Sequence, residues 1–177
     1  MIENKTYNNV INTLKNIGEN HKQIETVTTG DIFDINLEKM EKFALMHINP
    51  VSVNTADFGL TYNFQIFIAD LVSEKADWTN ANIQSANNLS NEQEVLSECL
   101  QIAVDIISML RHSTMQSEQG VDDINAPVYF AEGQQTLEPF TERFDNLLTG
   151  WVFSLDVLVA NDFQSCNIPA KNLGYGE

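Results

Sequence analysis

The pattern of hydrophobic and polar positions predicts two amphipathic helices. Near the N-terminus, hydrophobic residues recur at helical spacing at Tyr7, Val10, Ile11, Leu14 and Ile17, and Gly18 follows as the expected stop. A longer apolar stripe comprises Val95, Cys99, Ala103, Ile106 and Leu110. Ser90 precedes it as the expected N-cap, with Gln93 at the third helical position, Glu92 and Glu94 in the first turn, and Arg111 and His112 in the last. We therefore expect a short first helix and a long central helix that lies across a sheet.

Strand patterns occupy much of the remaining chain. Residues 24–35 are rich in Thr, Val and Ile and bend at Gly30-Asp31, which predicts a strand or a bent strand pair. Residues 43–54 and 60–71 predict two strands that pair as a hairpin, with Pro50 indicating an edge or a bulge. Residues 151–160 alternate with period two, which predicts a strand, and a shorter strand is expected near 128–130. Residues 140–148 could form a strand or a short helix, and we favour the strand. The fold class is therefore α+β, a mainly antiparallel β-sheet flanked by an N-terminal helix and one long central helix.

The segments between these elements predict loops within one domain. Residues 73–90 and 113–127 are polar, and neither a repeat nor a dividing linker is present. We expect a single domain over residues 1–165 and an extended C-terminal arm over 166–177. The N-terminus does not resemble a signal peptide, and the apolar runs are far shorter than a membrane span, so we expect an intracellular, reduced protein.

Charge narrows the possible functions. The chain has 9 Lys and Arg against 25 Asp and Glu, which gives a formal net charge of −16. Such a surface repels phosphate, so conventional nucleic-acid binding and binding to anionic membranes are disfavoured. Three interpretations remain for the acidity: solubility, a surface past which DNA slides, or a surface that imitates DNA.

The residues that could carry chemistry form no recognisable site. His21, His47 and His112 lack metal-ligand spacing, and the phosphate-binding and nucleophile motifs are absent. Cys99 belongs to the core stripe of a helix, and Cys166 lies in the tail, so both are poor candidates for a nucleophile. We therefore predict a protein without catalytic activity, cofactor or metal.

Two segments are candidates for contact with other subunits. Trp78 lies in the polar loop 73–90, where a large aromatic side chain is either packed locally or anchors an interface. Cys166 and Pro169 belong to the C-terminal arm, which either frays or docks on a neighbouring subunit.

Three segments give the chain a resemblance to a known protein family. The segments are FALMHINPVSVN…LTYNFQIFIADL, SNEQEVLSECLQIAVDIISML and GWVFSLDVLVANDFQSCNIP. In their order and composition, over about residues 1–169, they resemble tail-terminator and tail-completion proteins of tailed bacteriophages. The resemblance implies a sheet flanked by helices in a ring, commonly hexameric, that caps the tail tube and docks to the head connector. It implies no catalytic residues.

That resemblance gives the acidity a physical role. A negatively charged ring lumen would let DNA pass without binding to it. We hypothesise that Glu118, Asp122 and Asp123 line this channel or its rim. The implied location is the virion tail or neck, after assembly in the host cytoplasm.

Other functions remain open. The chain could be a neck or head–tail connector ring protein of a tailed phage, an acidic DNA mimic that inhibits a host enzyme, or a small enzyme or ligand-binding domain. The central helix carries few acids beyond its first turn, among them Glu98 and Asp105, which disfavours mimicry.

Overall fold

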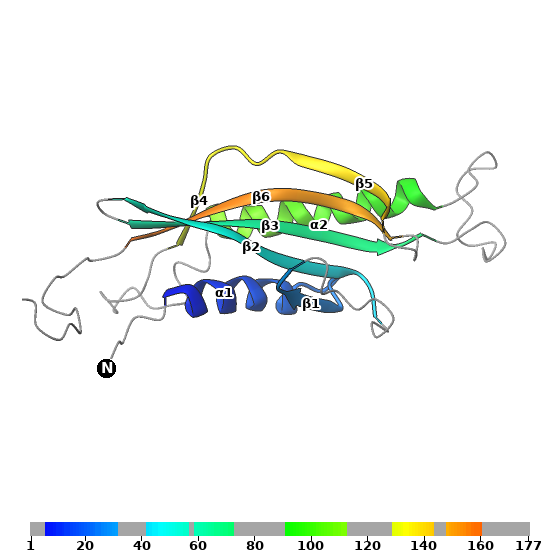
Figure 1. Cartoon of the computed structure of the whole chain (residues 1–177). Coiled ribbons are helices and arrows are strands. Elements are labelled where there is room, and N and C mark those ends of the chain that lie inside the picture. The colour runs from blue at the N-terminus through cyan, green and yellow to red at the C-terminus, as the bar shows by residue number, and fades with distance from the viewer. Residues whose placement is uncertain are drawn as a thin grey trace, which may run out of the picture.

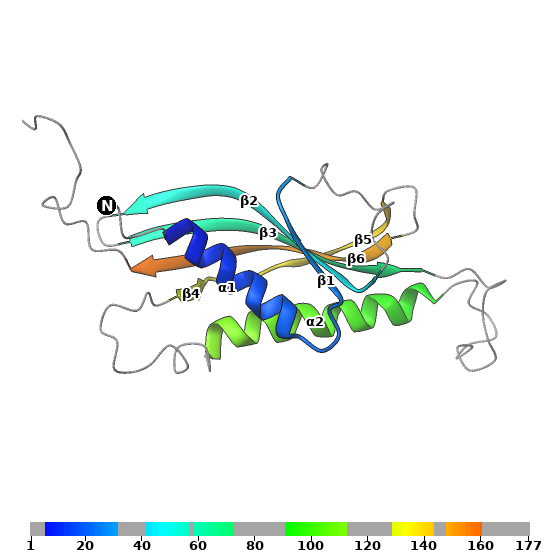
Figure 2. The ribbon, with the colours of Figure 1, turned by 90° about the horizontal axis from the view of Figure 1, so that it is seen from below.

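The chain folds into a single sheet with both helices on one face (Figures 1 and 2). The computed structural model describes residues 6–31, 42–56, 59–72, 91–112, 129–143 and 148–160. Within these ranges the sheet has six strands in the order β1-β2-β3-β6-β4, and β5 also pairs with β6. The elements are α1 Thr6–Asn20, β1 Thr26–Thr29, β2 Leu45–Ala56, β3 Gly59–Leu71, α2 Glu92–His112, β4 Tyr129–Glu132, β5 Leu137–Arg143 and β6 Leu148–Ala160. The predicted α+β class is confirmed.

The centre of the sheet consists of three long antiparallel strands. β2 and β3 pair from Leu45 opposite Ala69 to Ala56 opposite Gly59, which confirms the predicted hairpin. The register shifts between Pro50 and Ser52, so Pro50 does mark a bulge, as its missing N–H predicts. β3 pairs with β6 along its whole length, and only the short β1 runs parallel to its neighbour.

Alternation along the strands separates the two faces of the sheet. One face meets both helices and forms the main core, because its side chains are apolar at every second position. The largest fully buried side chains there include Leu14, Met46, Ile48, Phe64, Ile66, Ile102, Ile106 and Phe153. The other face bears no helix among the described residues, as is common for antiparallel sheets. It carries a smaller apolar cluster around Phe67 and Phe140.

The first helix is longer than predicted because Gly18 does not stop it. α1 continues to Asn20, and Gly18 lies where the helix passes close to the sheet. A Cβ at this position would lie 2.7 Å from the sulfur of Met46 and 2.8 Å from a methyl group of Val27. Gly18 therefore permits close packing, a role that spacing along the chain does not reveal.

The second helix begins one residue later than predicted. Its first helical residue is Glu92, and the N–H of Val95 donates to the carbonyl of Asn91 at 3.1 Å. Asn91 thus takes the N-cap position that we assigned to Ser90, which lies outside the described residues. The indole N–H of Trp151 donates to the carbonyl of Leu96 at 2.7 Å and joins this helix to β6.

The far edge of the sheet is one strand interrupted in its middle. β4 and β5 both pair with β6, with Glu132 opposite Asp156 and Leu137 opposite Phe153. From Glu132 to Leu137 the edge strand advances by five residues, whereas β6 advances by only three between the paired residues Phe153 and Asp156. The extra residues of the edge strand therefore arch away from the sheet (Figure 1). Gly133, at φ +70°, allows the chain to leave the strand direction. Of the strand predicted at 140–148, residues 140–143 belong to β5, which starts earlier, at Leu137. Residues 144–147 lie outside the described residues, and Leu148 is the first residue of β6.

The loops 73–90 and 113–127 and the arm 166–177 lie outside the described residues. The expected loops and arm therefore remain predictions. Neither helix of the described part combines the length and apolarity that crossing a membrane requires.

Candidate functional site

None of the six residues predicted to form interfaces falls within the described part of the chain. They are Trp78, Glu118, Asp122, Asp123, Cys166 and Pro169. Their roles remain predictions. Among the described residues, a different surface is the candidate interface.

That surface lies at the end of the domain where the β2–β3 hairpin turns, and we call it the hairpin surface. It is formed by Tyr7, Val51 and Val53, which are 45%, 63% and 47% exposed. Val53 lies opposite Tyr62 in the sheet, and the Tyr7 ring centroid is 6.2 Å from that of Tyr62. Tyr7 and Val53 therefore both neighbour Tyr62, and exposed Val51 lies two residues before Val53 in the same strand.

The hairpin surface is built from an uncharged part of the chain. Between Phe43 and Ala69 the only charged residue in the sequence is Asp57, and residues 6–14 of α1 have none. A chain with a net charge of −16 thus keeps a continuous stretch of two strands nearly free of charge. Charge depletion with exposed aromatic and apolar side chains is typical of the centre of protein interfaces. The uncharged run was visible in the sequence, but the exposure of Val51 and Val53 was not.

A row of hydrogen-bonded polar side chains crosses the face of the sheet without helices. The Ser52 hydroxyl donates to the Asn63 carbonyl oxygen at 2.8 Å, and the Asn54 amide donates to the same oxygen at 3.1 Å. The Asn63 amide donates in turn to the carboxylate of Asp156. This row joins β2, β3 and β6 through side chains and holds the hairpin in one orientation relative to β6.

The break between β4 and β5 opens a groove on the same face. The guanidinium of Arg111 donates to the carbonyl of Gly133 and to the side-chain oxygen of Gln135, which fixes the arch against α2. The groove has a volume of about 300 Å³ and is lined by Gln65, Gly133, Gln134, Gln135, Thr136, Glu138, Val152, Phe153, Ser154 and Asp156. Its amides, hydroxyls and carboxylates include no basic group, so it is a polar recess that disfavours phosphate.

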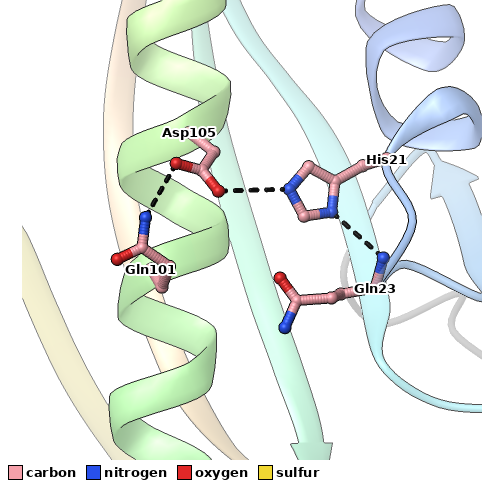
Figure 3. Close-up of polar contacts among 4 residues, drawn as sticks. All are labelled: His21, Gln23, Gln101 and Asp105. Atoms are coloured by element: carbon pink, nitrogen blue, oxygen red, sulfur yellow. Dashed lines mark hydrogen bonds and ion pairs between the residues drawn. The ribbon is translucent and has the colours of Figure 1, made fainter.

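His21, the residue after α1, forms a polar contact with Asp105 of α2 (Figure 3). The Nε2 atom of His21 lies 3.5 Å from Oδ2 of Asp105, and the Gln101 amide donates to Oδ1 of Asp105 at 2.8 Å. The Nδ1 atom of His21 accepts the main-chain N–H of Gln23 at 3.3 Å. A catalytic histidine paired with a carboxylate needs its second nitrogen for the reacting group. Here that nitrogen is occupied, so the contact positions α1 against α2.

His47 is a buried structural histidine. It is 1% exposed, with Nδ1 2.8 Å from the Thr28 hydroxyl and Nε2 3.1 Å from the Gly30 carbonyl. Since a carbonyl only accepts, Nε2 carries the proton and Nδ1 accepts from Thr28. Burial lowers the pKa of His47 more than the Gly30 carbonyl and Asp31 raise it, so the ring stays neutral.

Cys99 is equally unsuited to chemistry. It is 1% exposed, and burial, together with the carboxylates of Asp70 and Glu98, raises its pKa to about 12. The thiolate is the nucleophilic form, and Cys99 therefore stays a protonated, apolar core residue. Burial also raises the pKa of Asp70, although the N–H of Leu71 donates to it at 2.6 Å.

The described residues contain no group of three His, Cys, Asp or Glu close enough to hold a metal ion. No protein-family model and no curated protein matches this chain.

Proposed function

We propose that this chain is a structural virion protein of a tailed bacteriophage, a subunit of the tail-terminator ring. In this role it caps the tail tube, joins it to the head connector and acts by assembly without catalysis. The observation that carries the proposal is the hairpin surface: Tyr7, Val51 and Val53 are exposed on an uncharged stretch of an otherwise strongly acidic chain.

Electrostatics explains why such a division of charge suits a ring. Copies with a net charge of −16 repel each other, so they associate through surfaces that bring few carboxylates together. The remaining acidic surface then faces solvent and the lumen, where negative charge leaves passing DNA free to slide. In a ring built from one kind of subunit, every copy offers the same uncharged contact.

The fold supports the proposal because it holds the hairpin surface rigidly. β3 pairs with β2 on one side and with β6 on the other, and the Ser52–Asn63–Asp156 row couples the three strands. A preformed surface loses less conformational entropy on docking than a loop does.

Electron microscopy and mass photometry of the purified chain, alone and with purified tail tubes, test this function. We expect rings, or tubes capped at one end, for the unmodified chain, and neither for Val53→Asp, because an unpaired carboxylate would be buried in the contact. Asn16→Asp is the matched control: it adds the same charge at an exposed position of α1 and should assemble normally.

Other outcomes would overturn the proposal. A chain that stays monomeric at its solubility limit and leaves tubes uncapped is not a terminator. An acidic inhibitor would instead remain monomeric and compete with DNA for a nuclease.

A further inference from the structure

Five of the six exposed large hydrophobic side chains of the described residues belong to two surfaces. Tyr7, Val51 and Val53 form the hairpin surface, and Leu100 and Val104, which are 36% and 44% exposed, lie together on α2. Leu71, at the end of β3, is separate. Since residues four apart share one side of a helix, Leu100 and Val104 form a single apolar patch.

This patch belongs to a stripe of α2 that carries no acid. Steps of three and four residues from Gln93 run through Ser97, Leu100, Val104, Ile107 and Arg111. We call these six residues the α2 stripe. The acids Glu94, Glu98 and Asp105 lie on another side of the helix, and Asp105 there faces His21 of the α1 end. The α2 stripe therefore shows the same combination of exposed apolar side chains and missing carboxylates as the hairpin surface.

The two surfaces lie on opposite sides of the domain. β2 is near one edge of the sheet, whereas Arg111 at the end of the α2 stripe contacts the arch between β4 and β5 at the other edge. Figure 2 shows β2 and α2 along opposite long sides of the molecule. A surface that meets its own copy closes a dimer, whereas two different surfaces on opposite sides allow head-to-tail contacts.

We infer that the hairpin surface of one copy packs on the α2 stripe of the next copy. This inference deepens the proposed ring function and rests on it. Pairing two hairpin surfaces would leave Leu100 and Val104 in water on both copies, whereas the head-to-tail contact covers both apolar patches and brings no carboxylate from either surface into the interface. Val51 and Val53 meet Leu100 and Val104 in this arrangement.

Mixing two variants tests the inference. Val53→Asp disables the hairpin surface and Val104→Asp disables the α2 stripe, and each should weaken self-association by about 30-fold or more, the loss expected at an interface hot spot. Both positions are exposed, so circular dichroism should show native folds. Mixed together, the variants retain one intact pair of surfaces and should form heterodimers that do not grow. Ser154→Asp, exposed on the sheet face without helices, is the control and should assemble like the unmodified chain.

Disulfide cross-linking identifies the contact directly. In a background with Cys166→Ser, Val53→Cys mixed with Val104→Cys should give a cross-linked heterodimer, while buried Cys99 stays unreactive. A Val53→Cys homodimer in its place, or rings that survive Val104→Asp, would overturn the head-to-tail contact and leave the ring function standing. If the unmodified chain neither associates nor cross-links in any pairing and leaves tubes uncapped, both proposals fail.

Discussion

At the scale of single residues, His47 couples the stability of the sheet to pH. Its neutral ring bridges Thr28 and Gly30, and its pKa in the folded chain lies below the ordinary value of 6.5. The unfolded chain therefore binds a proton at a higher pH than the folded chain. The contribution of His47 is fully present above pH 6.5 and declines as the pH falls towards its folded pKa.

The variant His47→Gln should reveal this dependence: the difference in free energy of unfolding between the variant and the unmodified chain should become smaller as the pH falls. At pH about 7.5 we expect it to be less stable than the unmodified chain by about 1–3 kcal/mol, the cost of leaving a buried polar group unpaired. The difference should shrink at about pH 5.5, where the unmodified chain begins to lose its advantage. Urea denaturation followed by tryptophan fluorescence measures both values. Both proteins lose charge repulsion in acid, and comparing them at each pH cancels this shared effect. A difference in stability that grows as the pH falls would contradict a neutral His47 in the folded chain.

At the scale of elements, Gly150 sets how closely β6 can approach β3. A Cβ at Gly150 would lie 1.9 Å from the Ile68 carbonyl oxygen and 2.8 Å from Cα of Ala69. Both of these are backbone atoms of the central strand, so they cannot rotate away as a side chain would. Gly150→Ala should therefore separate the strands locally and lower the free energy of unfolding by about 3 kcal/mol.

A substitution elsewhere in β6 provides the comparison for Gly150→Ala. Ser154→Ala changes an exposed side chain of the same strand and should alter stability by no more than about 0.5 kcal/mol. Thermal unfolding measures both variants. Equal stability of Gly150→Ala and Ser154→Ala would contradict this prediction, because it would show that β6 can shift without a loss of stability.

At the scale of the whole molecule, net charge determines how salt affects assembly. The net charge of −16 opposes contact between copies, whereas the proposed interface contains no carboxylate from either surface. Raising the ionic strength from about 0.01 M to about 1 M shortens the Debye length from about 30 Å to about 3 Å and screens this repulsion. Self-association measured by sedimentation should therefore strengthen with salt. A contact that weakened with salt would depend on ion pairs and would exclude both surfaces described above.

The individual helices and strands could be predicted from the sequence, because each shows a hydrophobic pattern within one continuous segment of the chain. The period-two alternation of β3 and β6 and the stripe of α2 each place apolar side chains on one side of a single element. The pairing of β2 with β3 also follows, since a short connection leaves few alternatives. The six predicted interface residues, from Trp78 to Pro169, lie outside the described part and stay predictions.

Only the tertiary structure determined which of these helices and strands contact each other. It placed Tyr7 against Tyr62, brought Met46 and Val27 against Gly18, and inserted β6 between β3 and the interrupted edge strand. It also left Val53 exposed, in the part of β2 that lies beyond its pairing with β1. Such contacts join residues far apart in the chain, and their geometry depends on packing in three dimensions, which the order of residues along one strand or helix does not contain.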